Sequence, residues 1–256
     1  MRFRTLPCAV ILLAVVMPAV AQDLTIASKL TVNGKPGETQ TSYLSAARVR
    51  VPQGESTETI FDKPTGQMTT LDVRKKTYSI VTKKEMDEFA AKQKQQAAVP
   101  QSKEDEEGMK AFNAMMGGMV GELDVKKLGT TRKIAGYGCA NWEMTMGKMS
   151  RTEECLSEEL KIPTAVWEMY RTYSESMKLM MAPMMPNMEK AVEKMKAMKG
   201  YPLAYSSTID VMGNKTTMVS EVTEVKTGPI PASVWEIPAG YKKVESPMLR
   251  DPRARR

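Results

Sequence analysis

Residues 177–198 read MKLMMAPMMPNMEKAVEKMKAM, and this methionine-rich stretch is the basis of the fold prediction. Its methionines recur at the i, i+3, i+4 and i+7 spacing of one helix face. Pro183 and Pro186 interrupt the run, and a proline disfavours helix at the residue before it. The stretch therefore predicts two helices that meet at a kink and share one apolar stripe. Because thioether side chains are flexible and polarizable, such a stripe suits an irregular core or a permissive binding surface.

Strand patterns lie on both sides of the predicted helices. Short runs rich in threonine, valine and tyrosine fill residues 24–81, with turn residues such as Asn33-Gly34 between them. A spacing of roughly 8–12 residues between turns is typical of an antiparallel meander. The same pattern returns in residues 126–156 and 203–226.

Helix starts are marked by capping residues and by a proline. Residues 82–85 (TKKE) form a capping box, and a second one begins at Ser102. Pro163 predicts the start of another helix, with an apolar face made by Trp167, Tyr170, Ser174 and Met177. The order of strands, two helices, strands, two helices and strands predicts an α+β fold. We expect one curved antiparallel sheet, an open half-barrel, with helices packed on its concave face.

The N-terminus has the pattern of a secretion signal. Two arginines precede a short apolar run, and Ala19-Val20-Ala21 is a small-residue cleavage site before Gln22. The run is shorter than the roughly 20 residues needed to span a bilayer. We expect a cleaved signal peptide at 1–21, a single domain at 22–244 and a disordered basic tail at 245–256. The protein would then be periplasmic or secreted.

The charge of the chain is mildly positive and diffuse. The formal net charge is +7, and the lysine pairs are scattered rather than gathered in a stripe. This distribution argues against nucleic acid as a partner. The basic tail allows a weak contact with an anionic membrane surface. We expect a monomer.

The sequence contains no histidine, which removes the commonest general base and the commonest metal ligand together. The acidic pairs Glu153-Glu154 and Glu158-Glu159 are interpreted as solvated faces or helix starts. No carboxylate is predicted in an apolar pocket, where acid–base catalysis would need it. We therefore expect a non-enzyme without a cofactor.

Two cysteines, Cys139 and Cys155, remain after the signal peptide. A hairpin that turns at Gly147 would place Thr145 opposite Met149 and the two cysteines opposite each other. In an oxidising compartment this arrangement predicts a disulfide. A redox-active dithiol is the alternative, although no C-x-x-C spacing supports it.

Several short segments together resemble a family of secreted bacterial proteins, the domain of unknown function 4412 family. The matching segments are residues 60–62 (IFD) followed by 65–68 (TGQM), 72–78 (DVRKKTY), 133–139 (KIAGYGC), 199–203 (KGYPL), 228–232 (GPIPA) and 236–241 (EIPAGY). The resemblance implies a periplasmic or secreted protein with no established activity, and therefore no catalytic residues to assign. The order of elements is also similar to the lipoprotein-carrier fold, a half-barrel whose helices line an apolar cavity. Cys155 departs from the family pattern, so the disulfide would be local to this protein.

The main functional hypothesis is a carrier or binder of an apolar ligand, such as a lipid or an acylated protein. A methionine-lined groove would hold the ligand. The candidate ligand-binding residues are Met109, Phe112, Met116, Trp167, Tyr170, Met177, Met180, Met181, Met184, Met185 and Met188.

Two alternatives remain open for the same methionines. They are equally compatible with a purely structural role, as core residues between helices and sheet. Soft thioethers also select Cu(I), so that Met177, Met180, Met181 and Met184 are candidate copper ligands.

Overall fold

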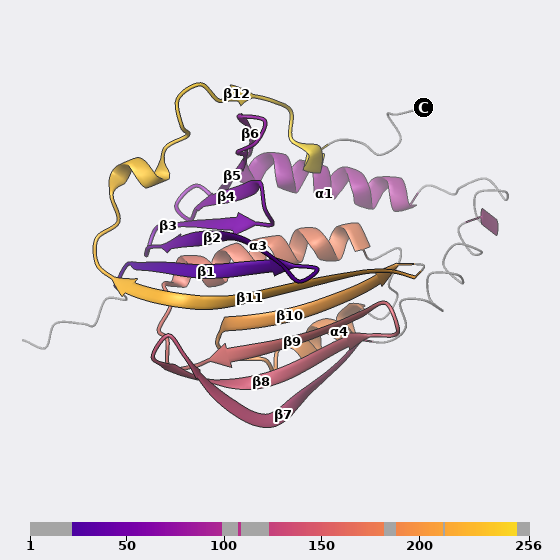
Figure 1. The fold of residues 1–256 in the computed structure, drawn as a ribbon. Coiled ribbons are helices and arrows are strands. Elements are labelled where there is room, and N and C mark those ends of the chain that lie inside the picture. The colour runs from indigo at the N-terminus through magenta and orange to yellow at the C-terminus, as the bar shows by residue number, and fades with distance from the viewer. Residues whose placement is uncertain (1–21, 99–106, 109–122, 182–187, 212, 250–256) are drawn as a thin grey trace, which may run out of the picture.

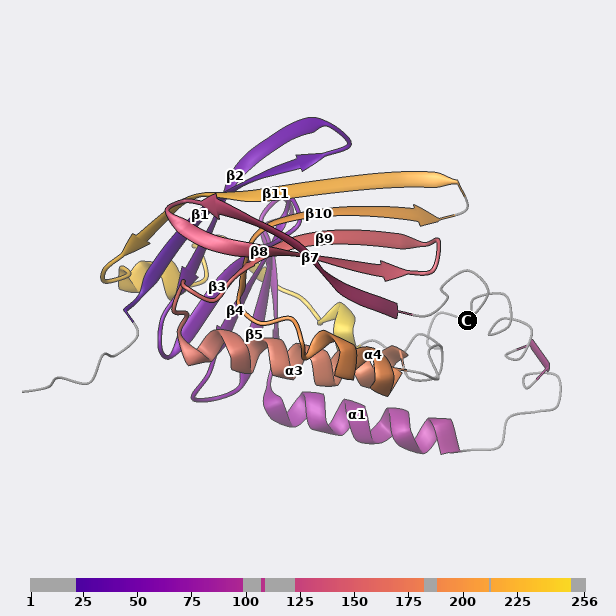
Figure 2. The same ribbon diagram turned by 90° about the horizontal axis from the view of Figure 1, so that it is seen from below.

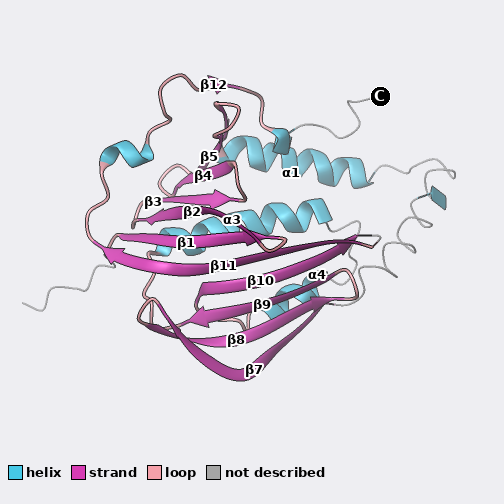
Figure 3. Ribbon diagram, in the orientation of Figure 1, coloured by secondary structure: helices cyan, strands magenta, loops and turns pink. Residues whose placement is uncertain are grey.

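The computed structural model describes residues 22–98, 107–108, 123–181, 188–211 and 213–249. Strands dominate this part of the chain, and three α-helices accompany them (Figure 3). The strands are β1 (Leu24–Val32), β2 (Lys35–Leu44), β3 (Arg48–Gln53), β4 (Thr57–Asp62), β5 (Gln67–Asp72), β6 (Thr77–Val81), β7 (Leu123–Ile134), β8 (Tyr137–Met146), β9 (Ser150–Ser157), β10 (Tyr201–Val211), β11 (Asn214–Thr227) and β12 (Lys242–Lys243). The helices are α1 (Lys83–Ala98), α3 (Thr164–Met181) and α4 (Met188–Met195), with short 3-10 turns at Ala232–Trp235 and Pro247–Leu249.

All twelve strands belong to one open sheet, in the order β12-β6-β5-β4-β3-β2-β1-β11-β10-β9-β8-β7 (Figure 1). Neighbouring strands are antiparallel except β12, which runs parallel to β6. The first strand lies in the middle of the sheet because β1 pairs with both β2 and β11. The predicted α+β class with an open, curved antiparallel sheet is therefore confirmed.

Local sequence signals explain where several elements begin and turn. Asn33 and Gly34 both have positive φ, at 50° and 75°, which is the geometry of a tight two-residue hairpin between β1 and β2. At the start of α1, the Thr82 backbone N–H donates to Glu85 Oε2 at 2.8 Å. The Glu85 N–H donates back to Thr82 Oγ1 at 3.2 Å, so the predicted capping box is present.

Helix α3 packs directly on the sheet. Ala165, Val166 and Met169 are buried in one cluster with strand residues such as Leu203 and Phe61. The helix N-terminus is also held by Lys63, which donates to Thr164 Oγ1 at 3.0 Å. Viewed from below, α1, α3 and α4 lie together on one side of the sheet (Figure 2).

The methionine-rich stretch contributes to two separate helices, as predicted. Helix α3 ends at Met181 and α4 begins at Met188. Lys194 fastens α4 to the edge of the sheet by donating to the Leu123 carbonyl of β7 at 2.8 Å. The predicted kink at Pro183 and Pro186 lies outside the described residues.

The hairpin β8–β9 carries the disulfide Cys139–Cys155, with the two Cα atoms 5.3 Å apart. The predicted bridge is therefore present, but the predicted register is wrong by two residues. Thr145 lies opposite Arg151 rather than Met149, and Asn141 lies opposite Cys155. The reason is the turn, which takes three residues, Gly147, Lys148 and Met149, instead of centring on Gly147.

After β11 the chain crosses back to the opposite edge of the sheet. The Arg50 guanidinium of β3 donates to the Val234 carbonyl at 2.6 Å and so holds the crossing segment. Regular structure continues through Leu249, five residues beyond the predicted domain boundary at 244, and Ser246 is buried. Among the described residues, no helix has the length and apolar character required to cross a membrane.

Candidate functional site

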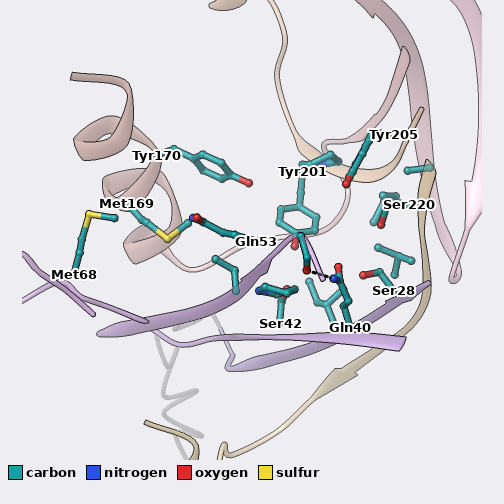
Figure 4. A pocket seen from close by; sticks show the side chains of 18 residues that line it. Ser28, Gln40, Ser42, Gln53, Met68, Met169, Tyr170, Tyr201, Tyr205 and Ser220 are labelled. Atoms are coloured by element: carbon teal, nitrogen blue, oxygen red, sulfur yellow. Dashed lines mark hydrogen bonds between the residues drawn. The ribbon is translucent and has the colours of Figure 1, made fainter. Parts of the chain in front are cut away.

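A cleft of about 320 Å³ lies between α3 and the sheet (Figure 4). Helix α3 contributes Met169 and Tyr170, and the facing wall comes from strands β1, β2, β3, β5, β10 and β11. Because β1 pairs with β11, residues from the two ends of the chain meet on this wall. The volume is at the lower end of the range for small-molecule sites.

The two ends of the cleft differ in chemistry. Met68 and Met169 lie at one end, whereas Tyr205 and Ser220 lie at the other (Figure 4). Between them the floor is mostly apolar and carries a few polar groups. The apolar floor includes Ile26, Val51, Leu203, Ala204 and Val222, and the polar groups include Ser28, Gln40, Ser42 and Gln53.

The Gln40 side chain is held in place at the floor, since its Nε2 donates to the Gly54 carbonyl at 2.5 Å. This contact joins β2 to the turn after β3. It fixes one polar group of the cleft by a backbone acceptor on a neighbouring element.

Three tyrosines meet in the cleft. Burial raises the pKa of Tyr201 far above its usual value, the nearby Tyr170 raises it further, and a hydrogen bond with Ser42 opposes the shift. Tyr170 is 42% exposed, yet surrounding protein displaces solvent from its hydroxyl and raises its pKa. Burial also raises the pKa of Tyr205. These hydroxyls therefore stay neutral hydrogen-bonding groups at physiological pH.

The same tyrosines are close to a carboxylate, Glu154 of β9. The strand register places Glu154 directly opposite Tyr205 on one side and Trp142 on the other. Its negative charge contributes to the raised pKa of both Tyr170 and Tyr205. Burial in turn raises the pKa of Glu154 itself.

The interpretation of Glu154 as part of a solvated face is therefore wrong. In a strand, successive side chains point to opposite faces, and only Glu153 of this pair points to solvent. Glu153 forms an ion pair with Arg151 at 2.8 Å, with its side chain 47% exposed. Glu154 is instead partly buried beside the cleft.

Another carboxylate of the same hairpin, Glu143, shows how a buried acid is ordinarily satisfied. Its side chain is 8% exposed and pairs with Lys126 and Arg151, each at 2.6 Å. The hydrogen bond from Lys126 is the main reason that the pKa of Glu143 is lowered. Among the residues that the structure describes, Glu154 has neither a hydrogen-bond donor nor an ion-pair partner.

The structure describes the positions of only some of the predicted ligand-binding residues. Tyr170 lines the cleft, whereas Trp167 is 45% exposed and reaches it only through its ring contact with Tyr170, 6.2 Å between centroids. Four predicted methionines belong to α3 or α4, but their side chains are not among those described: Met177, Met180, Met181 and Met188. The other predicted residues lie outside the described part of the chain: Met109, Phe112, Met116, Met184 and Met185. The methionine-lined groove and the alternative copper site therefore remain predictions.

The helix face that contacts the sheet is not the predicted one. Ala165, Val166 and Met169 are buried, while Trp167 is 45% exposed and Tyr170 lines the cleft. The spacing of Trp167, Tyr170, Ser174 and Met177 predicted one apolar face, whereas the smaller residues Ala165 and Val166, with Met169, pack in the core. The i, i+1, i+4 spacing of the three buried residues was a signal of this face.

The sequence reasoning also missed most of the cleft wall. Met68 comes from β5, whereas Tyr201, Tyr205 and Ser220 come from the distant hairpin β10–β11, and no short motif connects them. Within the described residues, no group of three or more histidine, cysteine, aspartate or glutamate side chains is arranged to hold a metal ion.

Solved structures resemble the fold at low sequence identity. PNGF-II matches at 11% identity and a TM-score of 0.42, over 88% of this chain and 31% of that one. The MucA/MucB complex from Pseudomonas aeruginosa matches at 13% identity and a TM-score of 0.35, over 86% of this chain and 56% of that one. The chain thus spans a third to about half of the length of these two relatives.

A LolA superfamily protein from Nitrosomonas europaea also matches. The identity is 8% and the TM-score 0.16, over 86% of this chain and 91% of that one. No curated protein matches the chain in sequence.

The family described as "Domain of unknown function (DUF4412)" matches residues 106–241. This range runs from before β7 to just before β12 and includes α3, the disulfide hairpin and the strands that carry Glu154, Tyr201 and Tyr205. Four of the sequence segments that carry the predicted resemblance lie within it: KIAGYGC, KGYPL, GPIPA and EIPAGY. The chain belongs to the DUF4412 family.

Proposed function

We propose that this protein is a non-catalytic binding or carrier protein for an apolar ligand, such as a lipid or the acyl chain of an acylated protein. The observation that carries the proposal is the cleft between α3 and the sheet. It combines a mostly apolar lining with a few fixed polar groups, as small-molecule sites do.

The shape of the sheet supports a site on its inner side. The strands curve around α3 rather than lying flat beneath it (Figure 2). On this proposal, the helices pack on the concave face and the cleft is the part of the concavity that side chains leave unfilled. A half-barrel of this kind presents a trough to an elongated ligand.

The sulfur atoms in the cleft support an adaptable lining. Met68 and Met169 face each other from β5 and α3 at one end (Figure 4). Helix α3 continues from there to Met181, and the methionines of residues 177–188 would extend the lining along its length. Flexible thioethers accommodate apolar ligands of different shape.

The disulfide supports an extracytoplasmic location. Structural disulfides persist in oxidising compartments and are rare in the cytosol. Both cysteines are almost fully buried, so the bridge belongs to the core. We propose that residues 1–21 direct export and that the protein acts in the periplasm or outside the cell.

Ligand binding is tested on the chain from Gln22 onward. The neutral fluorophore diphenylhexatriene should bind and gain fluorescence, and extraction of protein purified from a bacterial periplasm should release lipid detectable by mass spectrometry. Absence of both signals would contradict the proposal. Because diphenylhexatriene is uncharged, this experiment depends only on the apolar part of the cleft.

A variant that fills the cleft locates the site. Ser28→Phe places a ring among the floor residues, so binding of diphenylhexatriene should weaken about tenfold or more. Ala27→Phe is the matched control, since Ala27 precedes Ser28 in β1 but does not line the cleft. Thermal melts verify that both variants fold. Equal binding by the two would place the ligand elsewhere.

A further inference from the structure

Glu154 is an unusual group for the inner face of a sheet. It is a partly buried carboxylate, and within the described chain no donor or cation satisfies it. Placing a carboxylate away from water without a partner is unfavourable. By contrast, the buried Glu143 of the same hairpin has two cationic partners. Core packing therefore gives no reason for a glutamate at this position.

The surroundings of Glu154 are aromatic. Tyr205 and Trp142 are its two cross-strand neighbours, so their β-carbons lie about 4.5–5.5 Å from its own on the same face of the sheet. Tyr170 approaches from α3, close enough to sense the charge of the carboxylate. In Figure 4 the hydroxyl ends of Tyr170 and Tyr205 point toward the middle of the cleft, with Tyr201 between them. The electron-rich faces of aromatic rings attract cations.

In the part of the chain that the structure describes, no lysine or arginine pairs with Glu154. Lys127 lies opposite Trp142 in the β7–β8 ladder, and its ammonium stands 5.8 Å from the centre of the Trp142 ring. It makes no ion pair with Glu154. Within the described residues, Glu154 therefore has aromatic cross-strand neighbours and no cationic partner.

Glu154 also stands at a defined place relative to the cleft. Its neighbour Tyr205 marks the end opposite Met68 and Met169 (Figure 4). One end of the cleft thus offers sulfur and aliphatic carbon, and the other offers phenol rings, with the Glu154 carboxylate on the strand next to Tyr205. This polarity matches an amphiphile with an apolar tail and a positively charged head.

We propose that the cleft binds a cationic amphiphile, with its ammonium head paired to Glu154 between Tyr170 and Tyr205 and its alkyl tail directed toward Met68 and Met169. This inference rests on the proposed apolar-ligand function and specifies the chemical class of the ligand. Charge-assisted hydrogen bonds from the ammonium to the carboxylate would supply the partner that Glu154 lacks.

The test compares three probes with the same twelve-carbon tail, all used below their micelle concentrations at pH 7: dodecylammonium, dodecanol and dodecanoate. Dissociation constants are measured by displacement of diphenylhexatriene. We expect dodecylammonium to bind about tenfold tighter than dodecanol, and dodecanoate to bind more weakly than dodecanol. Glu154→Gln should remove the preference for the ammonium while leaving dodecanol affinity within about twofold.

Glu153→Gln is the matched control, because Glu153 is the adjacent residue of β9 and lies in solvent beside Arg151. It should keep the full preference for dodecylammonium. Equal affinity for dodecylammonium and dodecanol in the wild-type protein would overturn this inference and leave the apolar-ligand function standing. Failure of all three probes and of diphenylhexatriene to bind would overturn both. A preference that persists in Glu154→Gln would assign the cation to another group and also refute the inference.

Discussion

Adjacent glutamates of β9 occupy opposite environments because strand side chains alternate between the two faces of a sheet. Glu153 lies in solvent with Arg151, and Glu154 lies among the rings of Tyr170 and Tyr205. A carboxylate retained without a partner is a candidate functional group, since its environment disfavours the charge that it carries. Glu154 should therefore affect both the free energy of unfolding and the binding properties of the cleft.

The first prediction concerns the pH dependence of stability. Burial raises the pKa of Glu154 in the folded state, so the folded protein binds its proton more tightly than the unfolded chain does. The free energy of unfolding should therefore fall as pH rises from about 4, the unfolded value, through the folded pKa. Glu154→Gln removes this loss. Urea unfolding at several pH values should show that the free energy of unfolding of the variant increases relative to that of the wild type as pH rises from 4 to 7.

The control for this titration is Glu153→Gln, which removes an exposed ion pair worth about 1 kcal/mol or less. The stability of Glu153→Gln relative to the wild type should not increase toward neutral pH. If the free energies of unfolding of Glu154→Gln and Glu153→Gln change with pH in the same way, the Glu154 carboxylate is not in a poorly solvated environment.

Gly200, which precedes β10, illustrates a close approach between backbones. Its φ is +108°, and a β-carbon there would lie 2.5 Å from the Ser157 carbonyl oxygen. Gly200→Ala should lower the free energy of unfolding by roughly 2–4 kcal/mol, measured by urea denaturation. Gly213→Ala is the matched control, because φ is also positive but no atom lies within 4 Å of its β-carbon. It should cost about 1 kcal/mol, and equal losses would mean that the Ser157 contact is unimportant.

At the scale of elements, the hairpin β8–β9 is joined both by its ladder and by a covalent bridge. The bridge links residues that are 16 apart in sequence and lies in the core cluster with α3 residues such as Val166. Constraining a loop of this size restricts the unfolded chain. The bridge therefore stabilises the element that carries Glu154.

Replacing both Cys139 and Cys155 by serine should lower the free energy of unfolding by about 3 kcal/mol, because the unfolded chain regains the freedom that the bridge removed. Urea denaturation under oxidising conditions measures the loss. Addition of a reductant should destabilise the wild type but leave the serine variant unchanged. Free thiols in the oxidised, unfolded wild-type protein would contradict the bridge.

At the scale of the whole molecule, an open sheet leaves two edges that could pair with other chains. One edge is β7, which carries charged residues such as Lys126 and Arg132. The other is β12, only two residues long and composed of Lys242 and Lys243. Short strands and lysine side chains discourage pairing between molecules. The fold thus protects both edges without closing into a barrel.

Removing residues 242–256 should expose the edge of β6. The N–H groups of Lys242 and Val244 donate to the Lys76 and Tyr78 carbonyls at 2.9 and 2.8 Å, and these acceptors would lose their partners. We expect self-association, detected as a larger mass by light scattering on a sizing column. A chain that ends at Leu249 keeps β12 and is the control. If both truncated chains have the same mass, β12 does not protect the edge.

Features that depend on a few neighbouring residues were predictable from the sequence. The hairpin at Asn33-Gly34 and the capping box at Thr82 follow from turn preferences and capping chemistry. The Cys139–Cys155 bridge follows from the presence of two cysteines in one hairpin, although the predicted register was wrong. The class of the fold and the family resemblance also followed from patterns along the chain. These signals are local, so each could be interpreted without knowing how distant segments pack.

Only the tertiary structure decided the features that combine distant segments. The pairing of β1 with β11, the face of α3 that meets the sheet and the burial of Glu154 depend on which strands become neighbours. A single glutamate looks the same in a sequence whether it faces water or an aromatic cleft. Its environment is set by side chains from other strands and from α3, and long-range packing alone brings those side chains together.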